Sequence, residues 1–346
     1  MEENFLNLKR EDSLITEEEI KLEALLHAKK QREEKHAVKM AAAYIGFAYF
    51  LQLAVPYVSS FLLSFISALF GFIDEINALL SDSAFVMVLQ IVLSLLAFIP
   101  PYLLIGVGVK KKVTQLIDFG KPKQGTFLPT VLMGLGFCTF GNLVSNTISS
   151  LFNLVGIRFS SPDFIYPEGI FGSLLSLIAV AVTPALVEEF AMRGMVMGSL
   201  KTFGKGFAIM VSAAVFALMH GNLVQIPFAF TVGLALGFAV VKSGSIWTAV
   251  VIHFLNNGLS FLLDLLFGVV TDSNMQDLIM IGYFAAFILC FFVGLLLSSR
   301  KKDFWKGSKT EITLSVGQIA ATFFFSPVII VDIIITFFCC LQYISI

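Results

Sequence analysis

The stretch Thr183–Gly194 reads TPALVEEFAMRG and places two adjacent carboxylates and an arginine inside a run that is otherwise apolar. A charged side chain at the bilayer centre costs roughly 2.5–3.5 kcal/mol, so three unpaired charges would cost on the order of 8–10 kcal/mol. Glu189 and Arg193 are four residues apart, so they share one helical face and can pair. Glu188 lies about 100° around the helix from Glu189 and is left free for another role.

The composition predicts an all-α, polytopic transmembrane protein. The chain has 346 residues, of which 14% are charged, and its mean hydropathy is +0.89. These values exclude a soluble multidomain enzyme and give no indication of a nucleic-acid partner. The four cysteines all lie in apolar runs, so we expect buried small hydrophobic side chains rather than a disulfide framework.

The apolar runs predict a bundle of about eight to nine spans, each near the roughly 20 residues that a bilayer requires. We divide the chain into a charged helical tail (1–37), N-terminal membrane helices (38–169), core helices (170–267) and C-terminal membrane helices (268–346). In the tail we expect a helix from about Glu17 to Lys35. The first run is too long for one straight span, so its number of crossings is left open.

The charged residues between the spans alternate in sign along the chain. Basic residues occupy 110–123, 201–205, position 242 and 300–309, whereas acidic residues occupy 74–82 and 264–272. Positive charge gathers in cytosolic loops, so we expect the N-terminus and the basic loops in the cytosol, with the chain in the cell membrane. At 1.5 Å per residue, Glu188 lies about 20 Å from the cytosolic edge. We therefore expect a site below the membrane surface that opens to the cytosol.

Two of the four histidines lie in predicted spans, and each has a partner one helical turn away. Phe216 precedes His220 in FALMH, and Asn257 follows His253 in HFLNN. Residues four apart project from the same face. Ionisable groups inside a membrane are candidates for a functional site, although a single histidine can also be a satisfied core residue.

Two chemical schemes for amide hydrolysis fit these side chains. In the first, a glutamate–histidine pair removes a proton from water, and donors on another helix stabilise the oxyanion. In the second, Glu188, His220 and His253 bind a catalytic metal such as zinc and leave one position for water. The sequence leaves both schemes open.

Three motifs follow one another on successive predicted spans: E-E-x-x-x-R as EEFAMR, F-x-x-x-H as FALMH and H-x-x-x-N as HFLNN. In this order they resemble the motifs of the CPBP family, the CAAX prenyl endopeptidases and bacteriocin-processing enzymes also called Abi proteins. The resemblance covers 170–267, and the remaining spans match only as generic hydrophobic helices. No H-E-x-x-H, G-x-S-x-G or G-x-G-D motif is present, which argues against other intramembrane proteases.

The resemblance implies an intramembrane endopeptidase with four catalytic residues: Glu188, His220, His253 and Asn257. Glu188 would activate water beside His220, and His253 and Asn257 would hold the oxyanion. In the metal scheme, Glu188, His220 and His253 would be the ligands. Supporting structural roles would fall to Glu189, Arg193 and Phe216.

The resemblance also implies partners: a membrane-associated protein or peptide as substrate, and the lipid bilayer. Eukaryotic relatives act on a prenylated C-a-a-X tail, and bacterial relatives on peptides in processing, immunity or envelope regulation. Two other functions stay open: a non-catalytic scaffold or immunity factor that retains the motifs, and a transporter with midplane carboxylates. The transporter alternative predicts paired, similar halves, which the sequence does not show.

Overall fold

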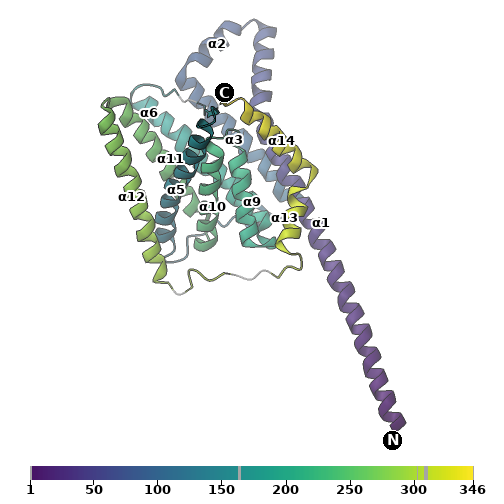
Figure 1. The fold of residues 1–346 in the computed structure, drawn as a ribbon. Helices are drawn as coiled ribbons and strands as arrows, with labels where there is room; N and C mark the ends of the chain where they lie inside the picture. The colour runs from purple at the N-terminus through teal and green to yellow at the C-terminus, as the bar shows by residue number, and fades with distance from the viewer. Residues whose placement is uncertain (1, 163–164, 302, 308–310, 346) are drawn as a thin grey trace.

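The computed structural model describes residues 2–162, 165–301, 303–307 and 311–345, with side chains from Glu17 onward. The chain is a bundle of helices joined mostly by short loops (Figure 1). The first half contains α1 (Glu2–Phe70), α2 (Ile73–Ser81), α3 (Ser83–Gly108), α4 (Val113–Leu116), α5 (Phe127–Asn153) and β1 (Arg158–Phe159). One long helical segment then comprises α6 (Gly169–Leu177), η1 (Ile178–Val182), α7 (Thr183–Glu189), η2 (Phe190–Val196), α8 (Met197–Leu200) and η3 (Lys201–Phe203). The chain continues with α9 (Lys205–Leu218), α10 (Gln225–Ser243), α11 (Ile246–Val269), α12 (Ser273–Ser299), α13 (Val316–Phe324), α14 (Pro327–Leu341) and β2 (Ile344–Ser345).

The predicted polytopic helical bundle is confirmed. In the part of the chain that the structure describes, 7 helices are long and apolar enough to cross a membrane, or 8 if one bent pair is a single span. The bent pair is α13 and α14, which meet at 65° where the sequence predicts one continuous span. Pro327 begins α14, and a proline cannot continue the helical hydrogen bonding of the preceding turn. The short predicted run near Gly206 is α9, a helix of 14 residues.

The first helix differs from the prediction. We expected a tail helix that ends near Lys35, but α1 is one helix of 69 residues. Between Glu17 and Lys39 the sequence has no glycine or proline, so nothing interrupts the backbone hydrogen bonds before the apolar residues begin. The prediction of an end near Lys35 is therefore wrong, and the division at residue 37 is not a break in the helix. Because α1 does not turn back, its apolar part crosses the membrane once.

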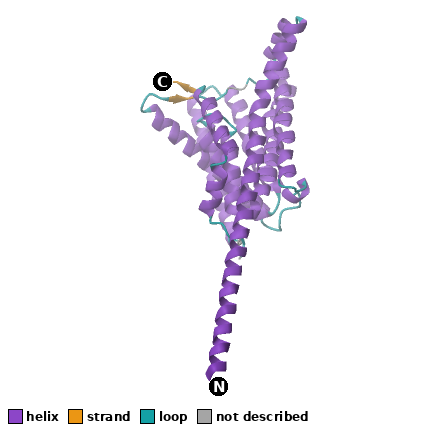
Figure 2. Cartoon of the chain, turned by 90° about the vertical axis from the view of Figure 1, so that its right-hand side faces the viewer, coloured by secondary structure: helices purple, strands orange, loops and turns teal. Residues whose placement is uncertain are grey.

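Two short strands add a feature that the all-helical prediction lacks. Arg158 of β1 pairs with Ser345 of β2, and Phe159 pairs with Ile344, in antiparallel register. The pairing holds the C-terminus against the loop that follows α5. Figure 2 shows the strands beside the C-terminus, at the end of the bundle opposite the projecting N-terminal part of α1.

The basic loops meet at the other end of the bundle. Lys201 forms an ion pair with Asp118 at 2.6 Å, and the backbone N–H of Lys123 donates to the Ser243 carbonyl at 2.8 Å. The Lys242 ammonium donates to the Phe304 carbonyl at 2.5 Å. These contacts confirm that the loops share one end of the bundle, whereas its assignment to the cytosol stays a prediction.

The α1–α14 contact contains a buried acid. Gly46 of α1 lies so close to α14 that an added Cβ would be 2.6 Å from the Val328 side chain and 3.0 Å from the Asp332 carboxylate. Asp332 is 2% exposed, and among the described residues neither of its carboxylate oxygens has a hydrogen-bond partner. We find no interaction that explains this acid.

The central helix α10 packs against α5 and α9. At Gly233 of α10, an added Cβ would lie 2.9 Å from the Ala213 Cα and 3.4 Å from the Arg193 guanidinium. Glycine therefore permits the helices to approach closely, as expected for small residues at helix interfaces in membranes.

Gly233→Leu should separate α9 from α10 and lower the thermal unfolding midpoint by several degrees, because overpacking of this kind costs about 1–3 kcal/mol or more. The matched control is Gly282→Leu in α12, where nothing lies within 4 Å of an added Cβ. Thermal unfolding of the purified proteins in detergent measures both changes. Equal midpoints for the two variants would contradict close packing at Gly233.

Candidate active site

The two adjacent glutamates lie at the end of α7, a short α-helix between the π-helical turns η1 and η2. A π-helical turn inserts an extra residue and rotates the residues that follow it, and such turns are frequent at functional sites. Glu189 is fully buried, whereas Glu188 lines a cavity. The local geometry therefore directs one carboxylate into the protein interior and the other towards open space.

Glu189 holds three helices together. One of its carboxylate oxygens accepts from the Arg193 guanidinium at 3.0 Å and lies 2.9 Å from Nδ1 of His253. The Arg193 guanidinium also donates to the Gly233 carbonyl at 3.2 Å and lies 4.3 Å from the centre of the Phe216 ring. The Glu189–Arg193 pair expected from the four-residue spacing is therefore present, and it is fully buried.

His253 connects the two glutamates. Because its Nδ1 faces the Glu189 carboxylate, the natural assignment is an Nδ1–H donor to that oxygen. Its other ring nitrogen, Nε2, then lies 3.9 Å from the Glu188 carboxylate. That distance is longer than a hydrogen bond but short enough for an electrostatic interaction between the two groups. His253 is thus held in one orientation beside Glu188.

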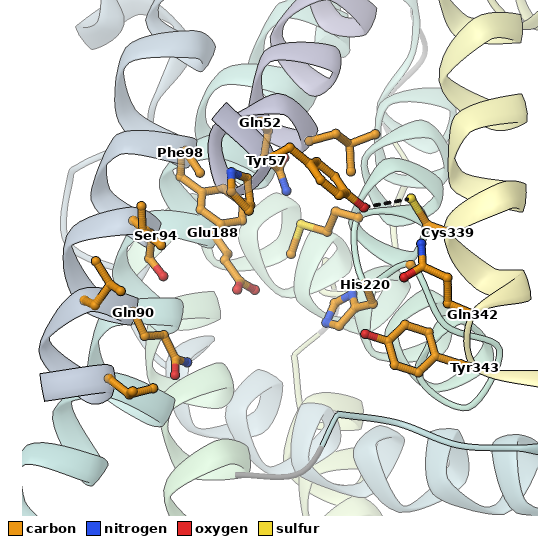
Figure 3. Close-up of a pocket in the computed structure, with 18 residues that line it drawn as sticks. Gln52, Tyr57, Gln90, Ser94, Phe98, Glu188, His220, Cys339, Gln342 and Tyr343 are labelled. Atoms are coloured by element: carbon orange, nitrogen blue, oxygen red, sulfur yellow. Dashed lines mark hydrogen bonds between the residues drawn. The ribbon is translucent and has the colours of Figure 1, made fainter. Parts of the chain in front are cut away.

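His220 approaches the same cavity from α9. Its Nδ1 lies 2.8 Å from the Phe216 carbonyl, so Nδ1–H donates and Nε2 is left with a lone pair. The Phe216 ring meets His220 and His253 edge to face, with centroids 5.2 and 5.8 Å away. Figure 3 shows the Glu188 carboxylate and the His220 imidazole directed into one cavity.

Asn257 occupies a different position from the one its proposed role requires. Its side-chain N–H donates to the Val180 carbonyl in η1 at 3.2 Å, and its oxygen accepts from Asn256 at 3.0 Å. Neither Asn257 nor His253 is among the side chains that line the cavity. Asn257 therefore ties α11 to the helix that carries Glu188, and its role at an oxyanion stays a prediction.

The cavity has a volume of about 540 Å³ and draws its walls from five parts of the chain. Its polar lining includes side chains that sequence reasoning missed: Gln52, Tyr57, Gln90, Ser94, Gln342 and Tyr343. Gln90 and Ser94 are four residues apart in a helix that is otherwise apolar, a signal that the sequence carried. No sequence pattern indicated Gln52 and Gln342, because only tertiary packing brings α1 and the C-terminal segment to the wall of the cavity. Apolar residues such as Leu53, Leu89 and Met219 complete the walls.

The position of the cavity conflicts with part of the prediction. Val86 and Gln90 belong to the first turns of α3, Gly221 follows α9, and Tyr343 follows α14. All of these lie towards the end of the bundle that carries the C-terminus, away from the basic loops (Figure 1). If the basic loops face the cytosol, the Glu188 cavity lies towards the opposite side. The two predictions, a cavity that opens to the cytosol and basic loops in the cytosol, cannot both hold in this fold.

Glu188, His220 and His253 have side chains of the types that bind metals, but the three side chains are not positioned around one point. A carboxylate and two imidazoles are suitable ligands for zinc, and Nε2 of His220 is available. However, among the described residues no three His, Cys, Asp or Glu side chains lie together as a metal site requires. His253 also lies behind Glu188 rather than in the cavity wall. The observed arrangement gives no basis for a step through a metal.

Comparisons with known proteins agree with the motifs. Residues 170–259 match the family model described as type II CAAX prenyl endopeptidase Rce1-like. The match is confined to these residues, which carry all three motifs. The chain is also 26% identical, over 199 residues, to the membrane-embedded CAAX protease MroQ of Staphylococcus aureus, covering 52% of this chain and 75% of MroQ. No solved structure matches the chain.

The matches confirm the resemblance to CAAX prenyl endopeptidases of the CPBP type. Together with the apolar helices, they support a multi-pass membrane protein that is similar to CAAX proteases. The match covers the helices that carry Glu188, His220 and Asn257. The matched region therefore contains every side chain that the motifs singled out.

Arg193→Met should lower the free energy of unfolding by about 3–5 kcal/mol, because it leaves the buried Glu189 carboxylate without its cation. The double variant Glu189→Gln/Arg193→Met should lose less than Arg193→Met alone, because the amide carries no charge and still accepts from His253. Denaturant titration in detergent measures both values. A double variant at least as unstable as the single variant would show that the ion pair is not what Arg193 contributes.

Proposed function

We propose that this protein is an intramembrane endopeptidase that hydrolyses a peptide bond of a membrane-associated protein or peptide. The observation that carries the proposal is the convergence of Glu188 and His220 on one cavity, within the region that matches the Rce1-like family model. Intramembrane ionisable groups are costly, and here they face a space large enough for substrate and water. The buried Glu189, Arg193 and His253 support this pair from behind.

In the proposed mechanism Glu188 is the general base. It removes a proton from a water that His220 orients through Nε2, and the water oxygen bonds to the peptide carbonyl carbon. The C–N bond then breaks, and the proton held by Glu188 passes to the leaving amine. The products are a carboxylic acid, which keeps the water oxygen and one hydrogen, and an amine, which takes the other hydrogen.

Two sets of donors are available for the oxyanion. In the first set, Nε2 of His253 lies 3.9 Å from the Glu188 carboxylate, while its Nδ1 faces Glu189. Asn257, one turn further on, would have to leave the Val180 carbonyl to join it. Gln90 and Ser94 already face the cavity from α3 (Figure 3). Of the two sets, only Gln90 and Ser94 line the cavity, so we assign the oxyanion to them. His253 and Asn257 position α11 beside Glu188.

The cavity also defines the class of substrate. Its walls combine aliphatic side chains with amides that can pair with an extended backbone. The relative MroQ is named a CAAX protease, but in this chain nothing in the lining selects a prenyl group. We therefore propose a membrane-anchored segment with apolar side chains on both sides of the cleaved bond.

Glu188→Gln should abolish cleavage, with a loss of about 10³-fold or more, because the amide cannot accept a proton from water. Since the substrate is unidentified, the readout is the set of protein N-termini in membrane fractions from cells that express wild type or variant. Wild type should generate termini that Glu188→Gln lacks. Glu168→Gln, at the start of α6, is the matched control and should resemble wild type. Identical termini in wild type and Glu188→Gln would favour a non-catalytic scaffold.

The same cleavage assay, performed on purified protein with one peptide identified from those termini, tests the metal. Glutamate-only catalysis predicts unchanged cleavage after treatment with a zinc chelator. Loss of cleavage that added zinc restores would contradict this scheme and favour Glu188, His220 and His253 as ligands.

We further propose that the protein lies in the cell membrane, with its N-terminus and basic loops in the cytosol and the Glu188 cavity open to the opposite side. A cysteine at Thr271, in the loop before α12, should react with an impermeant maleimide on intact cells. A cysteine at Lys121, in a basic loop, should react only after permeabilisation. Wild type provides the baseline for the native cysteines. The reverse pattern would place the cavity on the cytosolic side.

A further inference from the structure

A second cavity, of about 830 Å³, lies among the basic loops at the end of the bundle opposite the Glu188 cavity. We call it the lysine pocket. Its wall contains five lysines: Lys123, Lys205, Lys242, Lys301 and Lys306. Among its described lining residues Asp303 is the single acid. The pocket therefore concentrates positive charge from segments that are far apart in the sequence.

Hydrogen bonds between loops build the wall of this pocket. The Lys242 ammonium donates to the Phe304 carbonyl at 2.5 Å and to the Lys306 carbonyl at 3.3 Å. The Lys301 ammonium donates to the Gln124 carbonyl. The loop before α5, the end of α10 and the loop after α12 are thereby fixed around one space.

The charges in the lysine pocket are unbalanced. Asp303 pairs with Lys306 at 2.7 Å, and Lys242 and Lys301 reach only carbonyl oxygens. Lys123 and Lys205 have no acidic partner within 4.0 Å among the described residues. Like charges gathered around one cavity repel each other, and an anion in the cavity would relieve that repulsion.

The backbone adds to the positive potential. The 14-residue helix α9 begins at Lys205, and its N-cap residue Gly204 makes no side-chain hydrogen bond to the first turn. Gly204 and Gly206 both line the pocket, and an added Cβ at Gly206 would meet nothing within 4 Å. The N-terminus of α9 thus lies beside the lysines, an arrangement that favours phosphate groups.

The apolar part of the lining indicates what carries the anion. Phe203, Phe207 and Val241 lie in the same wall as the lysines. Next to the pocket Trp305 is 50% exposed and lies 6.0 Å from the Phe238 ring. Exposed tryptophan next to lysine is typical of the membrane–water interface, at the depth of lipid headgroups. A ligand with a phosphate and an apolar body fits this wall better than a free ion does.

We propose that the lysine pocket binds the phosphate group of an anionic phospholipid. Lys123 and Lys205 are the two cations available to it, supported by the N-terminus of α9, while Lys242 and Lys301 hold the loops in place. The site lies at the opposite end of the bundle from Glu188 and is independent of the proposed peptidase reaction. Basic pockets between membrane helices are suited to such headgroups.

The test is lipid-dependent thermal unfolding of the purified full-length chain in an uncharged detergent. Dioctanoyl phosphatidylglycerol should raise the unfolding midpoint of wild type in a saturable manner, whereas dioctanoyl phosphatidylcholine should not. For Lys123→Gln/Lys205→Gln, half of the effect should require roughly 10- to 30-fold more phosphatidylglycerol, since each lysine near a lipid surface contributes about 1 kcal/mol. Lys110→Gln/Lys121→Gln removes two charges from the same end outside the pocket and should bind like wild type.

Three outcomes would overturn the proposal. Equal weakening in both double variants would mean that overall charge, not the pocket, attracts the lipid. Displacement of the lipid effect by millimolar inorganic phosphate would make a free anion the ligand. Removal of two repelling charges should leave the stability of Lys123→Gln/Lys205→Gln unchanged or higher. If this variant has a much lower unfolding midpoint than wild type in the absence of lipid, the two lysines have a structural role instead. Lys123→Arg/Lys205→Arg keeps both charges and should retain binding.

Discussion

The site depends on the hydrogen bonds that the buried Glu189 carboxylate accepts. The carboxylate accepts from Arg193 on its own helix and from His253 on α11, and Arg193 in turn reaches the Gly233 carbonyl on α10. In a medium without water, each of these charges would be costly alone, and the ion pair offsets part of that cost. The second Glu189 oxygen and Nε of Arg193 have no hydrogen-bond partner among the described residues. Three helices are fixed relative to each other as a result. The orientation of His253 beside Glu188 is a direct consequence.

The sequence predicted the parts of this arrangement that depend on spacing along one helix. The four-residue separation of Glu189 and Arg193 predicts their pairing, and the separation of Phe216 and His220 predicts that they share one face. Both contacts are present. The different directions of Glu188 and Glu189 also agree with the 100° turn between adjacent residues.

Contacts between distant segments could not be predicted in this way. Asn257 shares a face with His253, as expected, yet its amide donates to the Val180 carbonyl. Val180 belongs to a π-helical turn that no pattern in the sequence predicted. The apolar run after Val316 gave no sign of the 65° bend between α13 and α14, apart from Pro327. The pairing of β1 with β2 depends on where the C-terminus arrives after that bend. Each of these features is decided by tertiary packing.

The two ends of the bundle differ in the charge of their loops and in the cavity that each contains. Acidic loops, the strand pair and the cavity of Glu188 lie at one end, and the basic loops and the lysine pocket lie at the other. Arg193, on the same helical segment as Glu188, forms its ion pair with Glu189. With the lysine pocket at the far end and Arg193 paired with Glu189, the described residues that line the Glu188 cavity include no lysine or arginine.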